Sequence, residues 1–165
     1  MIIELSALYR TCFAESPWFE VFGSGEVEED LLSALQKRDG VIVLAEKDGK
    51  IIGASVGYAF IHRTDMSDLI ENSDRVYYYA ELFVQNQYRG LGVANMLIAE
   101  REKVARQRGY LAAMVRTSVV QQIIQDIYSG RGFRVIARQN VMSDKVIDGQ
   151  AVRVPDERVI MHGAL

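Results

Sequence analysis

Two glycines, Gly90 and Gly92, stand between a run of aromatic and branched residues and a segment with helical spacing. In the order strand, loop, helix, the first turn of the helix presents unpaired N–H groups and a partial positive charge, which together attract an anion. Glycine has no Cβ, so the loop can take unusual dihedrals and a phosphate can approach its backbone closely. Arg89 adds a permanent positive charge beside the turn. The stretch therefore indicates a site for an anionic ligand, and a tight turn without a ligand is the alternative.

Two common nucleotide motifs do not fit this stretch. A dinucleotide-binding fold would have a third glycine where Asn95 stands. A P-loop would end in Gly-Lys followed by serine or threonine, and that ending is absent. The glycine pair alone thus leaves the ligand open.

A longer pattern narrows the choice. The segment after the strand-like ending Glu81-Leu82-Phe83-Val84 is Gln87-x-x-Gly90-x-Gly92-x-Ala94, and it resembles the acyl-CoA loop of the GNAT superfamily of N-acetyltransferases. Downstream, Ile127-Tyr128-Ser129-Gly130-Arg131-Gly132-Phe133 resembles the family's Leu-Tyr-x-x-x-Gly-Phe. The similarity in order and spacing covers roughly residues 41–162. It implies an α/β, GNAT-like fold with a mixed central sheet, in which the N-terminal strands are antiparallel, the central pair is parallel, and helices flank both.

The resemblance also implies acetyl-CoA as co-substrate and a set of residues that hold it. In this family the loop amides hold the pyrophosphate, and two strands splay so that freed backbone groups bind the pantetheine arm. Gln121 stands where many relatives have an asparagine that touches this arm. The expected cofactor-binding residues are therefore Leu82, Phe83, Val84, Gln87, Arg89, Gly90, Leu91, Gly92, Val93, Ala94, Asn95 and Gln121.

Acetyl transfer to an amine also needs proton management. An alkyl ammonium has a pKa near 10.4, so freeing its nitrogen at pH 7 costs about 4 to 5 kcal/mol. Glu81 is the only acid in the strand-like segment and is the candidate base, although Ala80 stands where relatives often carry a second acid. Tyr128 stands at the family's general-acid tyrosine and can donate a proton to the leaving thiolate. The structural alternatives are an edge glutamate paired with an arginine and a core tyrosine.

The remaining pattern predicts the elements around this site. Apolar spacing predicts a helix over 3–14, and Ser24-Gly25 followed by acids predicts a second helix that Gly40 closes. The aromatic patch of Trp18, Phe19 and Phe22 is expected to pack under a loop rather than line a substrate pocket. Further strands are predicted at 41–47, 51–61, 77–84, 111–117, 133–142 and 151–162, and further helices at 93–105 and 120–128, with a polar connection over 62–75.

Composition narrows the function classes. The 165 residues suit a single N-acetyltransferase domain over 1–165, and no apolar run is long enough for a membrane helix. The N-terminus lacks the pattern of an export signal, and one cysteine, Cys12, excludes an internal disulfide framework, so a cytoplasmic location is expected. Two distant histidines give no metal-ligand spacing, and no dense basic face indicates nucleic acid. A homodimer is expected by analogy with the superfamily.

The charge is unevenly divided along the chain. Residues 1–80 hold 14 acids and 7 bases, a balance of −7, whereas residues 81–165 hold 8 acids and 12 bases, a balance of +4. Solvated surface is the plain explanation. The functional one is an acidic half that faces a cationic acceptor, such as a polyamine, an aminoglycoside-like compound or a peptide N-terminus. The competing functions are a non-catalytic acyl-CoA-binding or sensor module and a nucleotide-binding domain.

Overall fold

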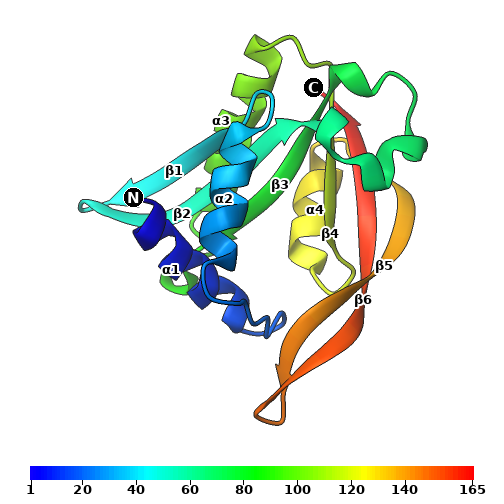
Figure 1. The fold of residues 1–165 in the computed structure, drawn as a ribbon. Coiled ribbons are helices and arrows are strands. Elements are labelled where there is room, and N and C mark those ends of the chain that lie inside the picture. The colour runs from blue at the N-terminus through cyan, green and yellow to red at the C-terminus, as the bar shows by residue number, and fades with distance from the viewer.

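The computed structural model describes residues 1–165 and contains one mixed, six-stranded sheet between helices (Figure 1). The α-helices are α1 (Ile2–Ala14), α2 (Glu26–Gln36), α3 (Val93–Gln107) and α4 (Gln122–Gly130). The strands are β1 (Val41–Lys47), β2 (Lys50–Ala59), β3 (Val76–Val84), β4 (Ala112–Ser118), β5 (Arg134–Ile147) and β6 (Gln150–Ala164). The strand order is β1-β2-β3-β4-β6-β5, and only β3 and β4 are parallel. The predicted mixed sheet is confirmed.

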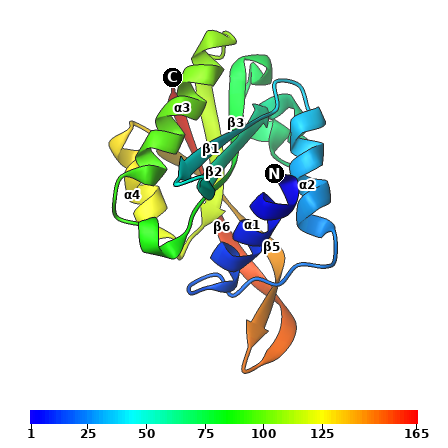
Figure 2. The same ribbon diagram turned by 90° about the vertical axis from the view of Figure 1, so that its left-hand side faces the viewer.

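Helices cover both faces of this sheet (Figure 2). On one face α1 and α2 bury an apolar cluster that includes Leu5, Leu31 and Phe83. On the other face α3 and α4 bury a second cluster around Ile98 and Tyr128. Both faces of the sheet are apolar, and each pair of helices shields one face from water. No helix combines the length and the apolar character that crossing a membrane would require.

A β-bulge interrupts the pairing of β2 with β3 and sets the direction of the residues that follow it. Val56 lies opposite Glu81, whereas Gly57 lies opposite Tyr79, so Ala80 is an extra residue on β3. Side chains therefore change sides at this point: Ala80 and Phe83 belong to the α1–α2 cluster, and alternation from Phe83 places Glu81 on the same face. Gly57 lies at this bulge, where a Cβ would collide with the ring of Tyr77.

β3 and β4 separate after a short parallel ladder. The ladder joins Val76–Tyr79 to Ala112–Val115, but β3 continues to Val84 and β4 to Ser118. The last residues of β3 consequently have a strand neighbour only on the β2 side. This divergence opens the middle of the sheet.

β2 and α4 have different bounds from those predicted, and the polar connection between β2 and β3 contains short helical turns. β2 ends at Ala59 rather than at residue 61, because Phe60–His62 forms a 3₁₀ turn. The 62–75 connection contains 3₁₀ turns at Thr64–Leu69 and Ser73–Arg75. The last helix begins at Gln122 rather than at residue 120.

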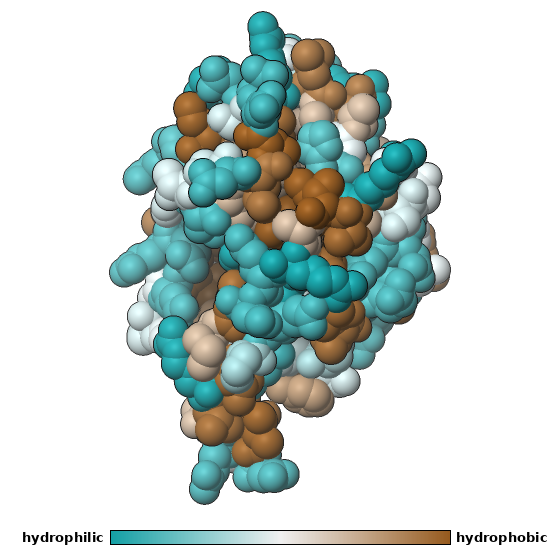
Figure 3. Space-filling view, turned by 90° about the vertical axis from the view of Figure 1, so that its right-hand side faces the viewer, coloured by the Kyte–Doolittle hydropathy of each residue, from teal (hydrophilic) through white to brown (hydrophobic).

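The C-terminal strands are longer than predicted. β5 and β6 pair along Arg134–Ile147 and Gln150–Ala164, and their hairpin projects beyond the rest of the sheet (Figure 1). Apolar side chains gather on the projecting end, which forms the lower end of the space-filling view (Figure 3). The exposed apolar residues of this end are Met142, Val146, Ile147 and Val152.

Candidate active site

A groove of about 570 Å³ lies where the end of β3 meets the start of α3. Its far wall is the start of α4, and its rim is the segment that follows α1. Of the residues predicted to hold a cofactor, those lining the groove are Leu82, Phe83, Val84, Arg89, Gly90, Gly92, Val93, Ala94, Asn95 and Gln121. The fold therefore brings ten of the twelve together. Gln87 and Leu91 are exposed and do not line the groove.

The loop before α3 presents a row of unused amides to this groove. The first amide of the helix with a backbone acceptor is that of Met96, which donates to Gly92 O, and the N–H groups of residues 90–95 donate to no protein group. Gly90 and Gly92 have φ values of 74° and 84°, a conformation that other residues rarely adopt. A Cβ at either position would meet no atom within 4 Å, so open space lies over both. The loop can therefore accept an anion.

The edge of β3 that faces the gap also carries free backbone groups. Gln85 donates its N–H to Ile52 O on the β2 side. Since successive residues of a strand direct their backbone groups to opposite edges, Leu82 and Val84 present theirs toward the gap. Val84 O already accepts a hydrogen bond there, at 2.8 Å from Arg89 Nε. An extended ligand can therefore bond to β3 at Leu82 as an additional strand would.

α4 and the residue pair before it carry an apolar stripe of Val120, Ile123, Ile124, Ile127 and Tyr128. Of these side chains only Tyr128 is buried. Ile123 is 77% exposed. The other four line the groove instead, where a ligand with an apolar arm would cover them.

The N-terminal segment supplies the opposite rim. Cys12 is buried, and it also borders the groove with Trp18. The prediction that the aromatic patch only packs under a loop is therefore wrong for Trp18. It holds for Phe22, which packs on Tyr9 in the core with the ring centroids 5.3 Å apart.

Arg89 lies on this rim but is occupied by protein groups. Its Nε donates to Val84 O, its Nη2 lies 3.0 Å from Glu15 Oε2, and its guanidinium lies over the Trp18 ring. These contacts join β3 to the segment after α1. A bound pyrophosphate would compete with Glu15 for this guanidinium.

A second cavity, of about 140 Å³, fills the gap between β3 and β4 and contains both predicted catalytic residues. Glu81 enters it from β3 and Tyr128 from α4. Leu82 and Gln121 belong to the walls of both the cavity and the groove. The two spaces are thus neighbours, and a ligand in the groove can present its end to Glu81 and Tyr128.

The environment of Glu81 suits a proton acceptor. Burial raises the pKa of its carboxyl to about 7, and the nearby charge of Glu20 acts in the same direction. The charge of Arg158 and the hydroxyl of Tyr9 oppose this rise. A base whose pKa lies near the working pH is the efficient one.

Comparison with known proteins decides the family. The model of the acetyltransferase (GNAT) family matches residues 4–133. This chain belongs to the GNAT acetyltransferase family. Members of that family use acetyl-CoA as co-substrate, so this prediction is confirmed at the level of the family.

Solved structures of other GNAT proteins share the fold. A ribosomal-protein-alanine N-acetyltransferase from Brucella melitensis superposes with a TM-score of 0.72 and 17% identity, over 99% of this chain and 94% of that one. An N-acetyltransferase from Staphylococcus aureus Mu50 gives 0.74 and 11%, over 99% and 92%. yncA from Salmonella typhimurium, solved with acetyl-CoA, gives 0.71 and 14%, over 99% and 88%. The GNAT-like fold class is therefore confirmed.

Sequence similarity to a curated protein covers a shorter stretch. The mouse protein described as probable N-acetyltransferase family 8 member 5 is 34% identical over 62 residues. These residues are 38% of this GNAT chain and 27% of the mouse protein. The match thus spans about a quarter of that relative's length.

Arg101 of α3 also lines the cavity, although no sequence pattern predicted it there. Its side chain is fully buried, yet its hydrogen-bond partners are two carbonyls and a hydroxyl and include no carboxylate. Nη1 donates to Val56 O at 3.0 Å and to Glu81 O at 2.7 Å, and Nη2 donates to the Tyr128 hydroxyl at 2.7 Å. Arg101 therefore joins the bulge to Tyr128. The signal was a charge at 101 on the otherwise apolar stripe of Val93, Leu97, Ile98 and Ala105.

Tyr128 is oriented by this contact. Because its oxygen accepts from Arg101, its own proton is free to be donated to another group. Burial raises the pKa of the Tyr128 hydroxyl, and the adjacent Arg101 guanidinium opposes that rise. The hydroxyl thus stays protonated near neutral pH and is still a better acid than it would be without Arg101.

Proposed function

We propose that this GNAT chain transfers the acetyl group of acetyl-CoA directly to a primary amine of a small molecule or a peptide N-terminus. One observation supports this most strongly. The row of unused amides at residues 90–95 lies at one end of a groove, and the other end adjoins the cavity that holds Glu81 and Tyr128. A phosphate-bearing thioester held at the loop would place its reactive end between a base and an acid.

The chain's own groups divide the work of binding. The amides of the loop and the helix dipole hold the pyrophosphate. The free edge of β3 bonds to the pantetheine arm, and the apolar stripe of α4 covers it. Acetyl-CoA supplies an activated thioester carbonyl, and an N–H fixed at the β3 edge near Leu82 can stabilise the charge that develops on its oxygen.

The proton path follows from the two titratable groups. Glu81 takes a proton from the acceptor ammonium, directly or through water, and leaves an amine lone pair. As the new N–C bond forms and the C–S bond breaks, Tyr128 donates its proton to the leaving thiolate. The second amine proton leaves to solvent and Tyr128 is reprotonated, so the products are an amide and a free thiol.

Arg101 is a positioning residue in this scheme. Its hydrogen bonds to Val56 O and Glu81 O satisfy carbonyls at the bulge that directs Glu81. Arg101→Met is expected to lower kcat about tenfold and to move the alkaline limb of the kcat profile to higher pH, because the Tyr128 hydroxyl loses the cation that lowers its pKa. Arg101→Lys should restore part of both. If Arg101→Met lost thermal stability but kept the wild-type dependence of kcat on pH, the role of Arg101 would be structural only.

The function is tested by release of free thiol from acetyl-CoA in the presence of an amine panel. Turnover with at least one primary amine supports the transferase. Tight binding of acetyl-CoA without turnover across the panel would favour the sensor alternative. A preference for a dinucleotide over CoA in thermal shift would favour a nucleotide-binding domain instead.

The loop can be tested separately with a matched pair of glycines. Gly92→Ala should weaken acetyl-CoA binding about 10- to 100-fold, because φ of 84° is costly for alanine and the added methyl group would enter the open space beside the loop. Gly49→Ala in the β1–β2 turn has φ of 73° and equally open surroundings, so it carries similar strain without facing the groove. Isothermal calorimetry should show weak binding only for the first. Equal affinities would place the diphosphate elsewhere.

The predicted homodimer has support from the C-terminal hairpin. β5 is the outer strand of the sheet and is covered only near Lys145, where Glu20 forms a bridge. Its exposed apolar side chains, Met142, Val146 and Ile147, form a surface that a second copy can bury. Sedimentation velocity would measure the state directly.

A further inference from the structure

The cavity that contains Glu81 has an unusual set of charges. Four arginines line it, Arg63, Arg101, Arg116 and Arg158, and Glu81 is the only acid among its lining residues. An amine site built for a purely cationic acceptor would be expected to carry the opposite balance. The net charge of the cavity therefore depends also on the acids that pair with these arginines from outside its wall.

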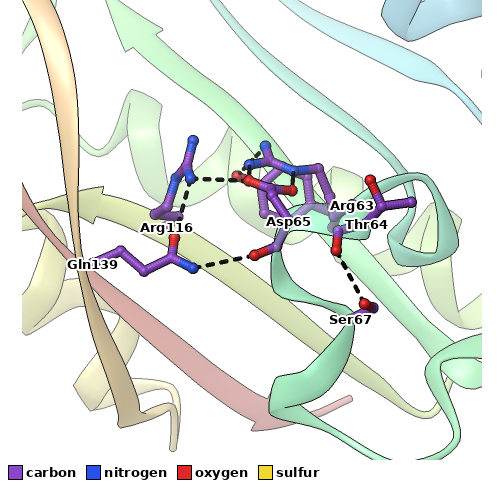
Figure 4. A network of polar contacts seen from close by, with 7 residues as sticks. Arg63, Thr64, Asp65, Ser67, Arg116 and Gln139 are labelled. Carbon is purple, nitrogen blue, oxygen red and sulfur yellow. Dashed lines mark hydrogen bonds and ion pairs between the residues drawn. The ribbon is translucent and has the colours of Figure 1, made fainter.

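Arg63 and Arg116 share one carboxylate (Figure 4). Arg63 holds Asp65 with both Nε and Nη2, and Arg116 Nη1 lies 3.1 Å from the same carboxylate. The hydrogen bond from Arg63 lowers the pKa of Asp65, so this carboxylate stays ionised. One negative charge thus faces two positive ones, and the cluster has a positive excess.

The other two arginines do not reverse this excess. Arg101 has no acidic partner. Arg158 lies 2.9 Å from Asp156 and 3.7 Å from Glu20, and Lys145 lies 3.9 Å from Asp156. That second cluster is balanced, with two acids and two bases. With Glu81 partly protonated near pH 7, the cavity as a whole is positive.

Unused donors show where an anion would bind. Arg116 makes its contacts only through Nη1, to Asp65 and to Gln139 Oε1 at 3.2 Å (Figure 4). Its Nε and Nη2 have no protein partner, and this edge of a guanidinium matches a carboxylate bidentately. Nε of Arg101 and Nε of Arg158 are also buried without an acceptor. A buried donor without an acceptor is costly, and no protein group accepts from these two.

We infer that the acceptor is a small amino acid-like compound whose carboxylate binds at Arg116 while its amine lies at Glu81. The inference rests on the proposed function and names its substrate class. The cavity, about 140 Å³, is small beside ordinary ligand pockets, which favours a free amino acid over a bulky amine. The surplus of acid in residues 1–80 predicted a cationic acceptor, and the wall of this cavity does not support that prediction.

Matched acceptors test the carboxylate. Thiol release is measured for α-, β- and γ-amino acids, for their carboxamides, for the corresponding decarboxylated amines, and for peptides with an acidic second residue. The best amino acid should exceed its carboxamide and its decarboxylated amine in kcat/KM by roughly 10- to 100-fold, the value of a charged hydrogen bond. If a peptide had a higher kcat/KM than every free amino acid, the recognised carboxylate would be that of a peptide side chain. Equal or better turnover of the decarboxylated amine would overturn the inference.

Variants of arginine locate the contact. Arg116→Gln should raise KM for the amino acid about tenfold or more, with little change in kcat and no change for the carboxamide. Arg138→Gln is the control, because Arg138 is an exposed β5 residue paired with Glu157 and lies outside the cavity. If Arg116→Gln lowered kcat/KM equally for the amino acid and its carboxamide, the assignment would be contradicted.

A binding measurement separates this inference from the proposed function. Thermal shift with the amino acid or its carboxamide, in the presence of CoA, scores carboxylate recognition without turnover. Selective stabilisation by the amino acid without any thiol release would overturn the transferase and keep the anion site. Thiol release with amines that lack a carboxylate, and no selective stabilisation, would do the reverse.

Discussion

Glu81→Gln is expected to lower kcat by about 10²- to 10⁴-fold, the usual loss when a general base is removed. The wild-type kcat should rise with pH and level off above about 7, because burial raises the pKa of Glu81 to about 7 and only the carboxylate accepts a proton. The glutamine variant should lose this limb. Steady-state thiol release between pH 5.5 and 9 measures both effects.

Glu81→Gln should also change the free energy of unfolding, in a direction that the pKa of Glu81 determines. The folded-state pKa of Glu81 is above the value of an unfolded glutamate, so the fold is penalised as pH rises from about 4.5 to about 7. Glu81→Gln should therefore be more stable than the wild type at pH 8, by roughly 1 to 3 kcal/mol. The difference should vanish near pH 4. Urea unfolding at both pH values measures it.

The control for both measurements is Glu46→Gln, an exposed acid of β1. It should leave kcat, its pH profile and the unfolding free energy nearly unchanged. If Glu81→Gln kept the wild-type limb near pH 7, another group would be the base. If it destabilised the protein at pH 8, the carboxylate would be paired in the fold rather than held at a cost.

Tyr128→Phe is expected to lower kcat about 100-fold or more while acetyl-CoA affinity stays nearly intact. The change removes the proton that the leaving thiolate receives, but the ring stays in the buried cluster beside Tyr79 and Phe133. It also leaves Arg101 Nη2 without an acceptor, which costs about 1 to 3 kcal/mol of stability. Single-turnover thiol release and calorimetric binding separate the two.

Tyr110→Phe gives a matched control. Tyr110 is also buried on the α3–α4 face, its hydroxyl donates to Asp39, and it lines neither the groove nor the cavity. It should lose a similar amount of stability with normal kcat. Equal losses of kcat and acetyl-CoA affinity in Tyr128→Phe would mean that Tyr128 packs against the cofactor site instead of donating a proton.

Local features of the chain were enough to predict the loop and most elements. Gly90 and Gly92 require positive φ, and the apolar spacing after Gly92 specifies a helix, so the strand–loop–helix unit and its free amides follow from neighbouring residues. The order of strands then constrained β3 and β4 to be parallel. These features depend on contacts between residues close in sequence, which sequence patterns can predict.

The tertiary structure alone decided how the site is lined. Arg101 reaches Val56 and Tyr128, 45 and 27 residues away, and Arg116 reaches Asp65, 51 residues away. The stripe of α4 is apolar in either role, and only the divergence of β3 from β4 makes it a groove wall rather than a core face. The type of a residue determines what its side chain can do chemically. Its partners depend on how elements far apart in the sequence pack together, and local spacing in the sequence does not predict that packing.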